Sequence, residues 1–156
     1  MSLSSDSPTK APRVAIILLG VLALFQIIRT AAFFMIQDVL AGKTPEAWLF
    51  PAGVDVFVGV AALFVAITLW TRKGLAIWTI AIVFFSISIS DHLDAITVVL
   101  NTKDPLPAMM GGPGGSASST VTMLAVAIVV EAFAIWVLTW KSLRAHYLGP
   151  KTNPQP

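Results

Sequence analysis

Residues 75–100 read LAIWTIAIVFFSISISDHLDAITVVL, a run without a charged side chain until Asp91. A helix rises ~1.5 Å per residue, so about 20 residues cross the ~30 Å hydrocarbon core of a bilayer. Three other apolar runs, at about 14–36, 49–71 and 120–140, reach this length. In lipid, a helix satisfies its backbone hydrogen bonds within its own segment. The sequence therefore predicts an all-α membrane four-helix bundle with antiparallel up-down topology.

The composition of the chain also favours a lipid bilayer as its surroundings. Hydrophobic residues make up 56% of the 156 residues and charged residues 12%, whereas soluble domains average about 25% charged residues. The basic residues lie mainly in tails and short loops, so the pI of 9.2 does not indicate nucleic acid as a partner. The absence of cysteine excludes disulfides, thiolate metal sites and iron–sulfur clusters.

Proline positions and the composition of the two ends set the expected domain boundaries. Pro51 is the proline nearest a helix interior, and it lies in the first turn of its span, where a missing N–H costs little. We therefore expect continuous helices within one transmembrane domain at 14–141. The polar, Ser- and Pro-rich ends predict a disordered cytoplasmic tail at 1–13 and a second cytoplasmic tail at 142–156.

The distribution of Lys and Arg predicts how the spans are oriented. Cytoplasmic loops and tails of membrane proteins carry the excess of these residues. One side of the predicted topology has two, Lys43 and Lys103. The other side has Lys10, Arg13, Arg72, Lys73, Lys141, Arg144 and Lys151. The sequence thus predicts a multi-pass protein of the cell membrane with both termini cytoplasmic, and Trp48 is expected at the outer interface.

Each span carries an ionisable residue, and all four fall at a similar depth. Counted from the centre of each span, Arg29, Asp55 and Asp91 lie slightly to the outer side and Glu131 lies near the middle. A charge at the centre of a helix in lipid costs about 2.5–3.5 kcal/mol. We therefore expect these groups to face one another in a polar cavity. Its candidate residues are Gln26, Arg29, Asp55, Asp91, His92, Asp94 and Glu131.

Small residues beside the acids support the inward orientation. Ala52, Gly59 and Ala62 share a helix face with Asp55, and Ala127 and Ala134 flank Glu131 in the same way. Small side chains let helices approach closely in lipid. Gln26 and Arg29 share a face of the first span and can donate hydrogen bonds to the acids. A pair between Arg29 and Asp55 or Asp91 that only fixes the fold is the competing interpretation.

The charges in the predicted cavity do not balance. Arg29 supplies one positive charge against four potential negative charges on Asp55, Asp91, Asp94 and Glu131. Some acids stay protonated, or an external cation or charged His92 balances them. Acids of this kind at depth serve proton-coupled movement.

The functional hypothesis is therefore proton- or cation-coupled handling of a small solute through an outward-facing polar cavity. A non-catalytic accessory or scaffold subunit of a larger membrane complex is the first alternative, and a membrane protein that binds a small ligand or a metal is the second. Four helices are few for a transporter, so transport would require a homo-oligomer or a larger membrane complex.

Metal and catalytic sites are not expected. Asp91, Asp94 and Glu131 are the remaining metal candidates, but the Glu-x-x-His pairs of di-iron bundles are absent. Ser86, Ser88 and Ser90 lie near His92 but point to different faces of the helix, so they give a weak case for a hydrolase. Serine in a membrane helix more often bonds its own helix or a neighbouring one. For His92, a hydrogen bond to the outer loop is the favoured interpretation. No catalytic residue and no cofactor are predicted.

Residues 50–66, FPAGVDVFVGVAALFVA, resemble a pattern found in small bacterial four-helix integral membrane proteins of about this length, for which no activity is known. In that pattern, Pro-Ala-Gly and an Asp precede a helix rich in small residues. Pro51, Ala52, Gly53 and Asp55 match it, whereas Val54 stands where a Gly is common. The resemblance implies four helices in a bacterial inner membrane and no catalytic residues.

Overall fold

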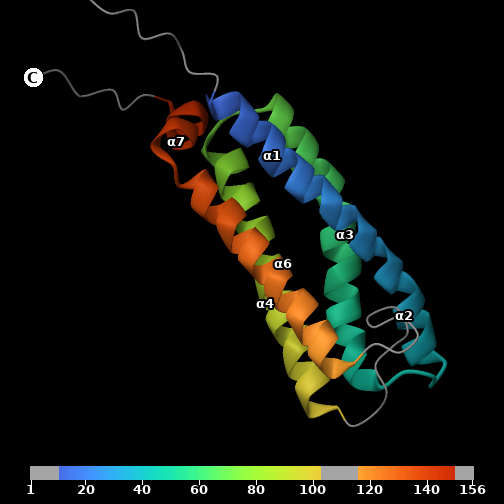
Figure 1. The fold of residues 1–156 in the computed structure, drawn as a ribbon. Helices are drawn as coiled ribbons and strands as arrows, with labels where there is room; N and C mark the ends of the chain where they lie inside the picture. The colour runs from blue at the N-terminus through green and yellow to red at the C-terminus, as the bar shows by residue number, and fades with distance from the viewer. Residues whose placement is uncertain (1–10, 103–115, 150–156) are drawn as a thin grey trace, which may run out of the picture.

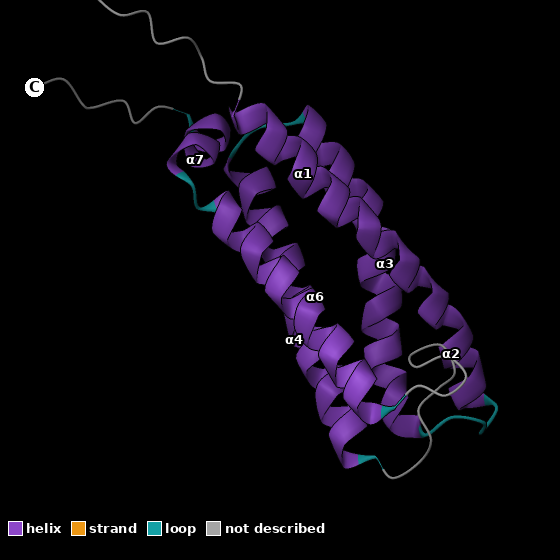
Figure 2. Cartoon of the chain, in the orientation of Figure 1, coloured by secondary structure: helices purple, strands orange, loops and turns teal. Residues whose placement is uncertain are grey.

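The computed structural model describes residues 11–102 and 116–149 (Figure 1). Within these two ranges, the regular structure is helical and no strand is present (Figure 2). Four helical stretches there are long and apolar enough to cross a membrane: Pro12–Leu40, Glu46–Thr71, Leu75–Asn101 and Ala117–Leu138. The all-α prediction is therefore confirmed for the described residues. The part of the predicted N-terminal tail before residue 11 lies outside them.

The first span contains a tighter helical segment near its middle. α1 (Ala11–Phe25) leads into η1, a 3-10 helix over Gln26–Ala31, and α2 (Ala32–Leu40) completes the span. The prediction of a continuous α-helix is therefore wrong over Gln26–Ala31. The span also continues to Leu40, beyond the predicted end at residue 36. No proline lies in this segment, and its backbone packs closely against Gly59 of the second span.

In the described part of the chain, two short and three long helices follow the first span. The short 3-10 helix η2 (Glu46–Trp48) precedes α3 (Leu49–Thr71), which is followed by α4 (Leu75–Asn101), α6 (Ala117–Leu138) and α7 (Lys141–Leu148). In Figure 1, α1 starts at the end that carries the C-terminal helix, α3 returns to that end, α4 leaves it and α6 returns again. α1 packs against α3, α3 against α4, and α4 against α6.

A glycine allows the short connection between α3 and α4. Gly74 precedes α4 with φ of +119°, a backbone conformation that other residues rarely adopt. The amide of Arg72 donates to the carbonyl of Thr68 (2.9 Å), which closes the last turn of α3. The connection therefore reverses the chain within three residues and places Arg72 and Lys73 at the same end as α7.

Residues 142–148, which the sequence assigned to a terminal tail, form α7 instead. Leu143 and Tyr147 of α7 are buried. The Tyr147 hydroxyl donates to the carbonyl oxygen of Leu69 (2.9 Å), near the C-terminus of α3. The last carbonyls of a helix have no partner within it, so this bond satisfies one of them. Trp78 Nε1 does the same for the carbonyl of Leu138 in α6 (3.0 Å).

Two apolar clusters form the core, one toward each end of the spans. The first lies nearer α7 and contains Leu19, Leu69 and Phe85. The second lies at the other end and contains Met35 and Trp48. Trp48 is fully buried in this second cluster, and its expected place at the depth of the outer lipid–water interface stays a prediction. Along each span, the residues between the two clusters include the predicted ionisable group.

Candidate functional site

Arg29 lies at the centre of the polar layer between the two apolar clusters. Its Nε donates to Asp55 Oδ1 of α3, and its Nη2 donates to Asp91 Oδ2 of α4. Its Nη1 donates to Ser88 Oγ of α4 and to Gln26 Oε1 of η1, the latter at 3.3 Å. All three guanidinium nitrogens are therefore used, and the residue joins the first span to the second and the third.

Glu131 of α6 is the second centre of the same layer. Its Oε1 accepts from Ser88 Oγ (2.5 Å) and from Gln26 Nε2 (3.1 Å), and its Oε2 lies 3.1 Å from His92 Nδ1. Arg29 Nη1 is 4.0 Å from Glu131 Oε1. Ser88 thus accepts from the guanidinium and donates to the carboxylate, so it links the two centres. We call these seven residues the Arg29 cluster: Gln26, Arg29, Asp55, Ser88, Asp91, His92 and Glu131.

The 3-10 winding of η1 aligns the two donors that this span contributes. In a 3-10 helix there are three residues per turn, so side chains at i and i+3 lie directly above one another. Gln26 and Arg29 have this spacing and bond to each other. The backbone of η1 also lies directly on α3. A Cβ atom added to Gly59 would be 2.6 Å from the amide nitrogen of Thr30, so only glycine fits there.

The acids of the Arg29 cluster are almost completely withdrawn from solvent. Exposed fractions are 8% for Asp55, 4% for Asp91 and 1% for Glu131. Among the described residues, these carboxylates face one permanent cation, Arg29, and one imidazole, His92. The Oδ1 atom of Asp91 is buried and has no hydrogen-bond partner there. A buried charge without compensation is costly, so the cluster requires at least one further positive charge or a bound proton.

The structure brings together most of the residues that the sequence singled out. Gln26, Arg29, Asp55, Asp91 and Glu131 form one bonded network. Asp94, one turn beyond Asp91, is half-buried, and no hydrogen bond or ion pair joins it to another described residue. His92 Nδ1 bonds to Glu131, and the outer loop to which its expected hydrogen bond was assigned lies largely outside the described residues.

Ser88 is the functional candidate that sequence reasoning missed. The sequence placed it among Ser86, Ser88 and Ser90 without distinguishing the three. Ser90 bonds the carbonyl of Ser86 in its own helix, as serine in membrane helices commonly does. Ser88 is fully buried and bonds across helices. The available signal was its spacing, because Ser88 lies three residues before Asp91 and four before His92, on one helix face.

The metal candidates do not form a coordination site. Within residues 11–102 and 116–149, no group of three or more His, Asp or Glu side chains is arranged to hold a metal ion. The guanidinium of Arg29 binds Asp91 and lies 4.0 Å from Glu131 Oε1, and Asp94 is not part of the network. A cation in place of Arg29 would have to displace it from its bonds to α3 and α4.

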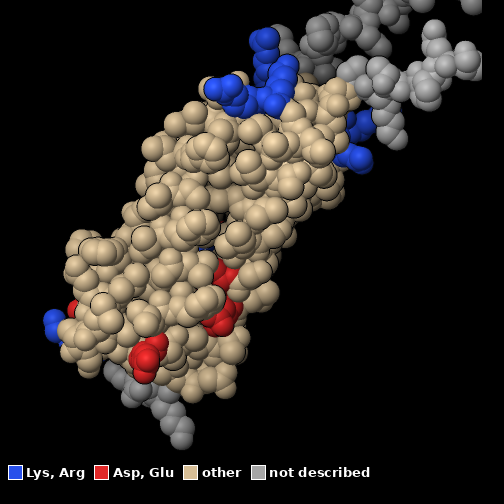
Figure 3. Space-filling model, turned by 180° about the vertical axis from the view of Figure 1, so that it is seen from behind, with Lys and Arg blue, Asp and Glu red and all other residues tan. Residues whose placement is uncertain are grey.

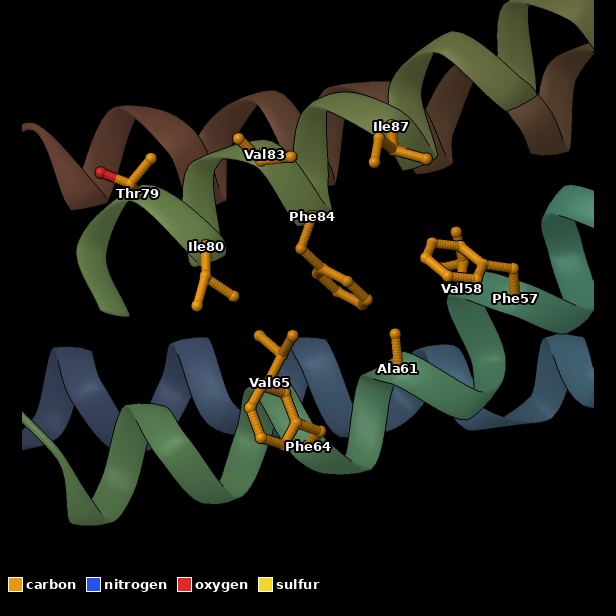
Figure 4. Close-up of a pocket in the computed structure, with 10 residues that line it drawn as sticks. All are labelled: Phe57, Val58, Ala61, Phe64, Val65, Thr79, Ile80, Val83, Phe84 and Ile87. Carbon is orange, nitrogen blue, oxygen red and sulfur yellow. The ribbon is translucent and has the colours of Figure 1, made fainter. Parts of the chain in front are cut away.

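An apolar pocket of about 240 Å³ lies between α3 and α4 (Figure 4). Phe84 of α4 and Phe57 of α3 are among the residues that line it, and its lining includes none of the ionisable residues. A shallower hollow of about 690 Å³ shares Phe57 and Ile87 with it and extends to Glu46. The predicted polar cavity is thus distinct from this pocket, and its outward opening stays a prediction.

Basic and acidic side chains lie in different parts of the molecule. In the view of Figure 3, most Lys and Arg side chains gather at the end near the tails, and Asp and Glu side chains lie in the opposite half. Arg72 and Lys73 follow α3, and Lys141 and Arg144 belong to α7, which packs at that end. This arrangement is the charge asymmetry typical of a membrane protein with a cytoplasmic side.

Comparisons with protein-family models, with curated proteins and with solved structures found no match to this chain. The resemblance of residues 50–66 to small bacterial membrane proteins therefore stays a prediction. A functional proposal depends on the chemistry of the Arg29 cluster itself.

Proposed function

We propose that this chain is an integral protein of a cell membrane that couples the movement of a proton or another cation to the handling of a small solute. Its four spans cross the bilayer as an antiparallel up-down bundle, with both termini in the cytoplasm. The observation that carries the proposal is the buried contact network of three carboxylates around a single guanidinium between four membrane-length helices. Ionisable groups inside a membrane domain commonly mark ion pathways and proton relays.

The charge of the cluster supports coupling. With His92 neutral, Arg29 carries +1 against three carboxylates, so the fully ionised cluster is negative. Binding of a proton or cation reduces this charge, and its release restores it. Because Arg29 joins η1 to α3 and α4, a change in its partners changes how three helices attract one another. A solute that enters from the outer side would then meet a cluster whose charge depends on the bound ion.

Reconstituted vesicles test this proposal without knowledge of the solute. Purified protein is incorporated into liposomes that contain a pH-sensitive dye, and a potassium gradient with valinomycin drives ion movement. We expect acidification of the lumen that Glu131→Gln abolishes, because Gln removes one of the negative charges with which the cluster attracts the ion. Asp38→Asn is the matched control, since Asp38 is an acid of α2 that pairs with Lys43 (3.6 Å) away from the cluster. Radioactive sodium uptake replaces the dye for the cation arm.

An accessory or scaffold subunit is the second candidate, and one observation favours it. Every nitrogen of the Arg29 guanidinium is bonded, as expected for an ion pair that fixes helix packing. In that case Arg29→Ala lowers the yield of folded protein and removal of one acid restores it, while Glu131→Gln changes neither flux nor folding. Ion flux equal in protein-containing and empty liposomes would refute the coupling proposal and leave the accessory role.

A further inference from the structure

We propose that the ion held by the Arg29 cluster is a proton and that it resides on Oδ1 of Asp91. This inference rests on the proposed function, which leaves the identity of the ion open.

The carboxylate oxygens of the cluster are unequally occupied. Oε1 of Glu131 accepts from Gln26 and Ser88, and Oε2 lies at bonding distance from His92. Oδ2 of Asp91 accepts from Arg29. Oδ1 of Asp91 is the carboxylate oxygen that is buried without a partner among the described residues. The free atom and the ion-pairing atom of this carboxyl are therefore different, so Asp91 can take a proton while Arg29 stays in place.

The coordination available at this oxygen suits a proton and not a metal cation. Ca²⁺ takes about 6–8 oxygen ligands, and Mg²⁺ requires near-octahedral geometry. In the described part of the chain, no group of three or more His, Asp or Glu side chains is arranged to hold a metal ion. A proton needs one oxygen: an O–H bond forms at Oδ1, the carboxylate loses its charge, and release of the proton to water reverses both changes.

The charges that face Asp91 also favour the protonated form. Arg29 from η1 lies between Asp91 and Asp55 of α3, while Glu131 of α6 pairs with His92. Arg29 carries one positive charge and pairs with both Asp55 and Asp91, so it balances only one of these two carboxylates. Asp94, one turn beyond Asp91 on the same helix face, adds to the negative potential there. With one proton on Asp91, Arg29 is balanced by Asp55, and Glu131 keeps its contact with His92.

Asp55 is the less suitable place for the proton. Its side chain is 12% exposed, whereas that of Asp91 is 2% exposed. Water can therefore stabilise a charge on Asp55 better than one on Asp91, because burial without compensation penalises the ionised form. The cluster thus divides its acids into one ionised partner of Arg29 and one neutral acid that holds the exchangeable proton.

Infrared difference spectroscopy tests the protonation directly. Protein in lipid nanodiscs is measured at neutral and alkaline pH, in H₂O and in D₂O. We expect a carboxylic-acid C=O band at neutral pH that shifts in D₂O, is lost in Asp91→Asn and persists in Asp94→Asn, the matched acid one turn away. A band that persists in Asp91→Asn, or the absence of any such band in the wild-type protein, would overturn the assignment.

Thermal unfolding of the same samples provides a second readout. Asn mimics a neutral Asp, so Asp91→Asn should keep the melting temperature of the wild-type protein, whereas Asp55→Asn removes the anion from Arg29 and should lower it. Equal loss in both variants would contradict the inference. The inference would also be contradicted if NaCl or CaCl₂ raised the melting temperature of the wild-type protein and N-methylglucamine chloride at equal ionic strength did not. If Asp91 is protonated but the protein conducts no ions, the coupling function is refuted and the assignment of the proton to Asp91 stands. If sodium drives the flux, the identification of the ion as a proton is refuted and the coupling function stands.

Discussion

Replacement of Gly59 by alanine probes the contact that holds η1 against α3. The added Cβ would lie 2.6 Å from the Thr30 amide nitrogen, 2.8 Å from Thr30 Cγ2 and 3.2 Å from the Arg29 carbonyl carbon. Atoms in favourable contact are ~3.5 Å apart or more, so η1 and α3 would have to separate by about 1 Å. Such overpacking costs about 1–3 kcal/mol, and alanine recovers about 0.5–1 kcal/mol in a helix, so we expect a net loss of up to about 2.5 kcal/mol.

Gly53 provides the matched control, because it lies in the same helix and a Cβ added to it would meet no atom within 4 Å. Gly53→Ala should therefore stabilise the protein by about 0.5–1 kcal/mol through helix propensity alone. Both variants are unfolded by denaturant in detergent micelles, with tryptophan fluorescence as the signal. Gly59→Ala should also weaken the bonds of Arg29, because the whole η1 segment moves. Equal stability of the two variants would show that the backbones of η1 and α3 do not touch, and the account of the 3-10 segment would be wrong.

Two further predictions concern buried hydrogen bonds. Ser88→Ala should lower the free energy of unfolding by about 2 kcal/mol, since it removes bonds to two charged groups; Ser90→Ala should change it by less than about 0.5 kcal/mol in the same denaturant assay, and equal effects would contradict the bridging role of Ser88. Burial raises the pKa of Tyr147 to about 12. The neutral phenol is favoured in the folded state, so its contribution to stability is complete below the unfolded pKa of about 10 and is lost as pH rises through about 12. Tyr147 is the single tyrosine, so an ultraviolet titration of tyrosinate reports this group alone, and a midpoint near 10 would refute the buried hydroxyl. Tyr147→Phe should cost about 1 kcal/mol through loss of the bond to Leu69 and should lack this alkaline decline.

The elements of the fold were predictable to different degrees. The length of each apolar run predicts a span within a few residues, because hydrophobic transfer depends on composition more than on packing. The 3-10 segment was not predictable in this way, since Gln26–Ala31 contains no helix breaker and its backbone packs against Gly59 of α3, a contact that the sequence does not reveal. α7 was missed because its polar composition resembles a tail, whereas two residues, Leu143 and Tyr147, are enough to dock it.

The membership of the site was easier to predict than its bonds. A charge in an apolar run has few acceptable surroundings, so Arg29, Asp55, Asp91 and Glu131 were expected to meet. Which acid pairs with which donor depends on the direction in which each side chain points, and the depth of a residue along its helix does not predict that direction. This is why the bond between His92 and Glu131 was not predicted.

The position of the cluster links its charge state to the shape of the first span. Arg29 belongs to the only described part of that span with 3-10 winding, whose hydrogen-bond geometry is poorer than that of an α-helix. Its guanidinium binds α3 and α4, while Gln26 from the same segment binds α6 through Glu131. When a proton binds to Asp91 or leaves it, the electrostatic attraction between η1 and the helices α3, α4 and α6 therefore changes. Gly59 keeps this segment in backbone contact with α3, so a displacement of Arg29 is transmitted to α3 directly and does not depend on flexible side chains.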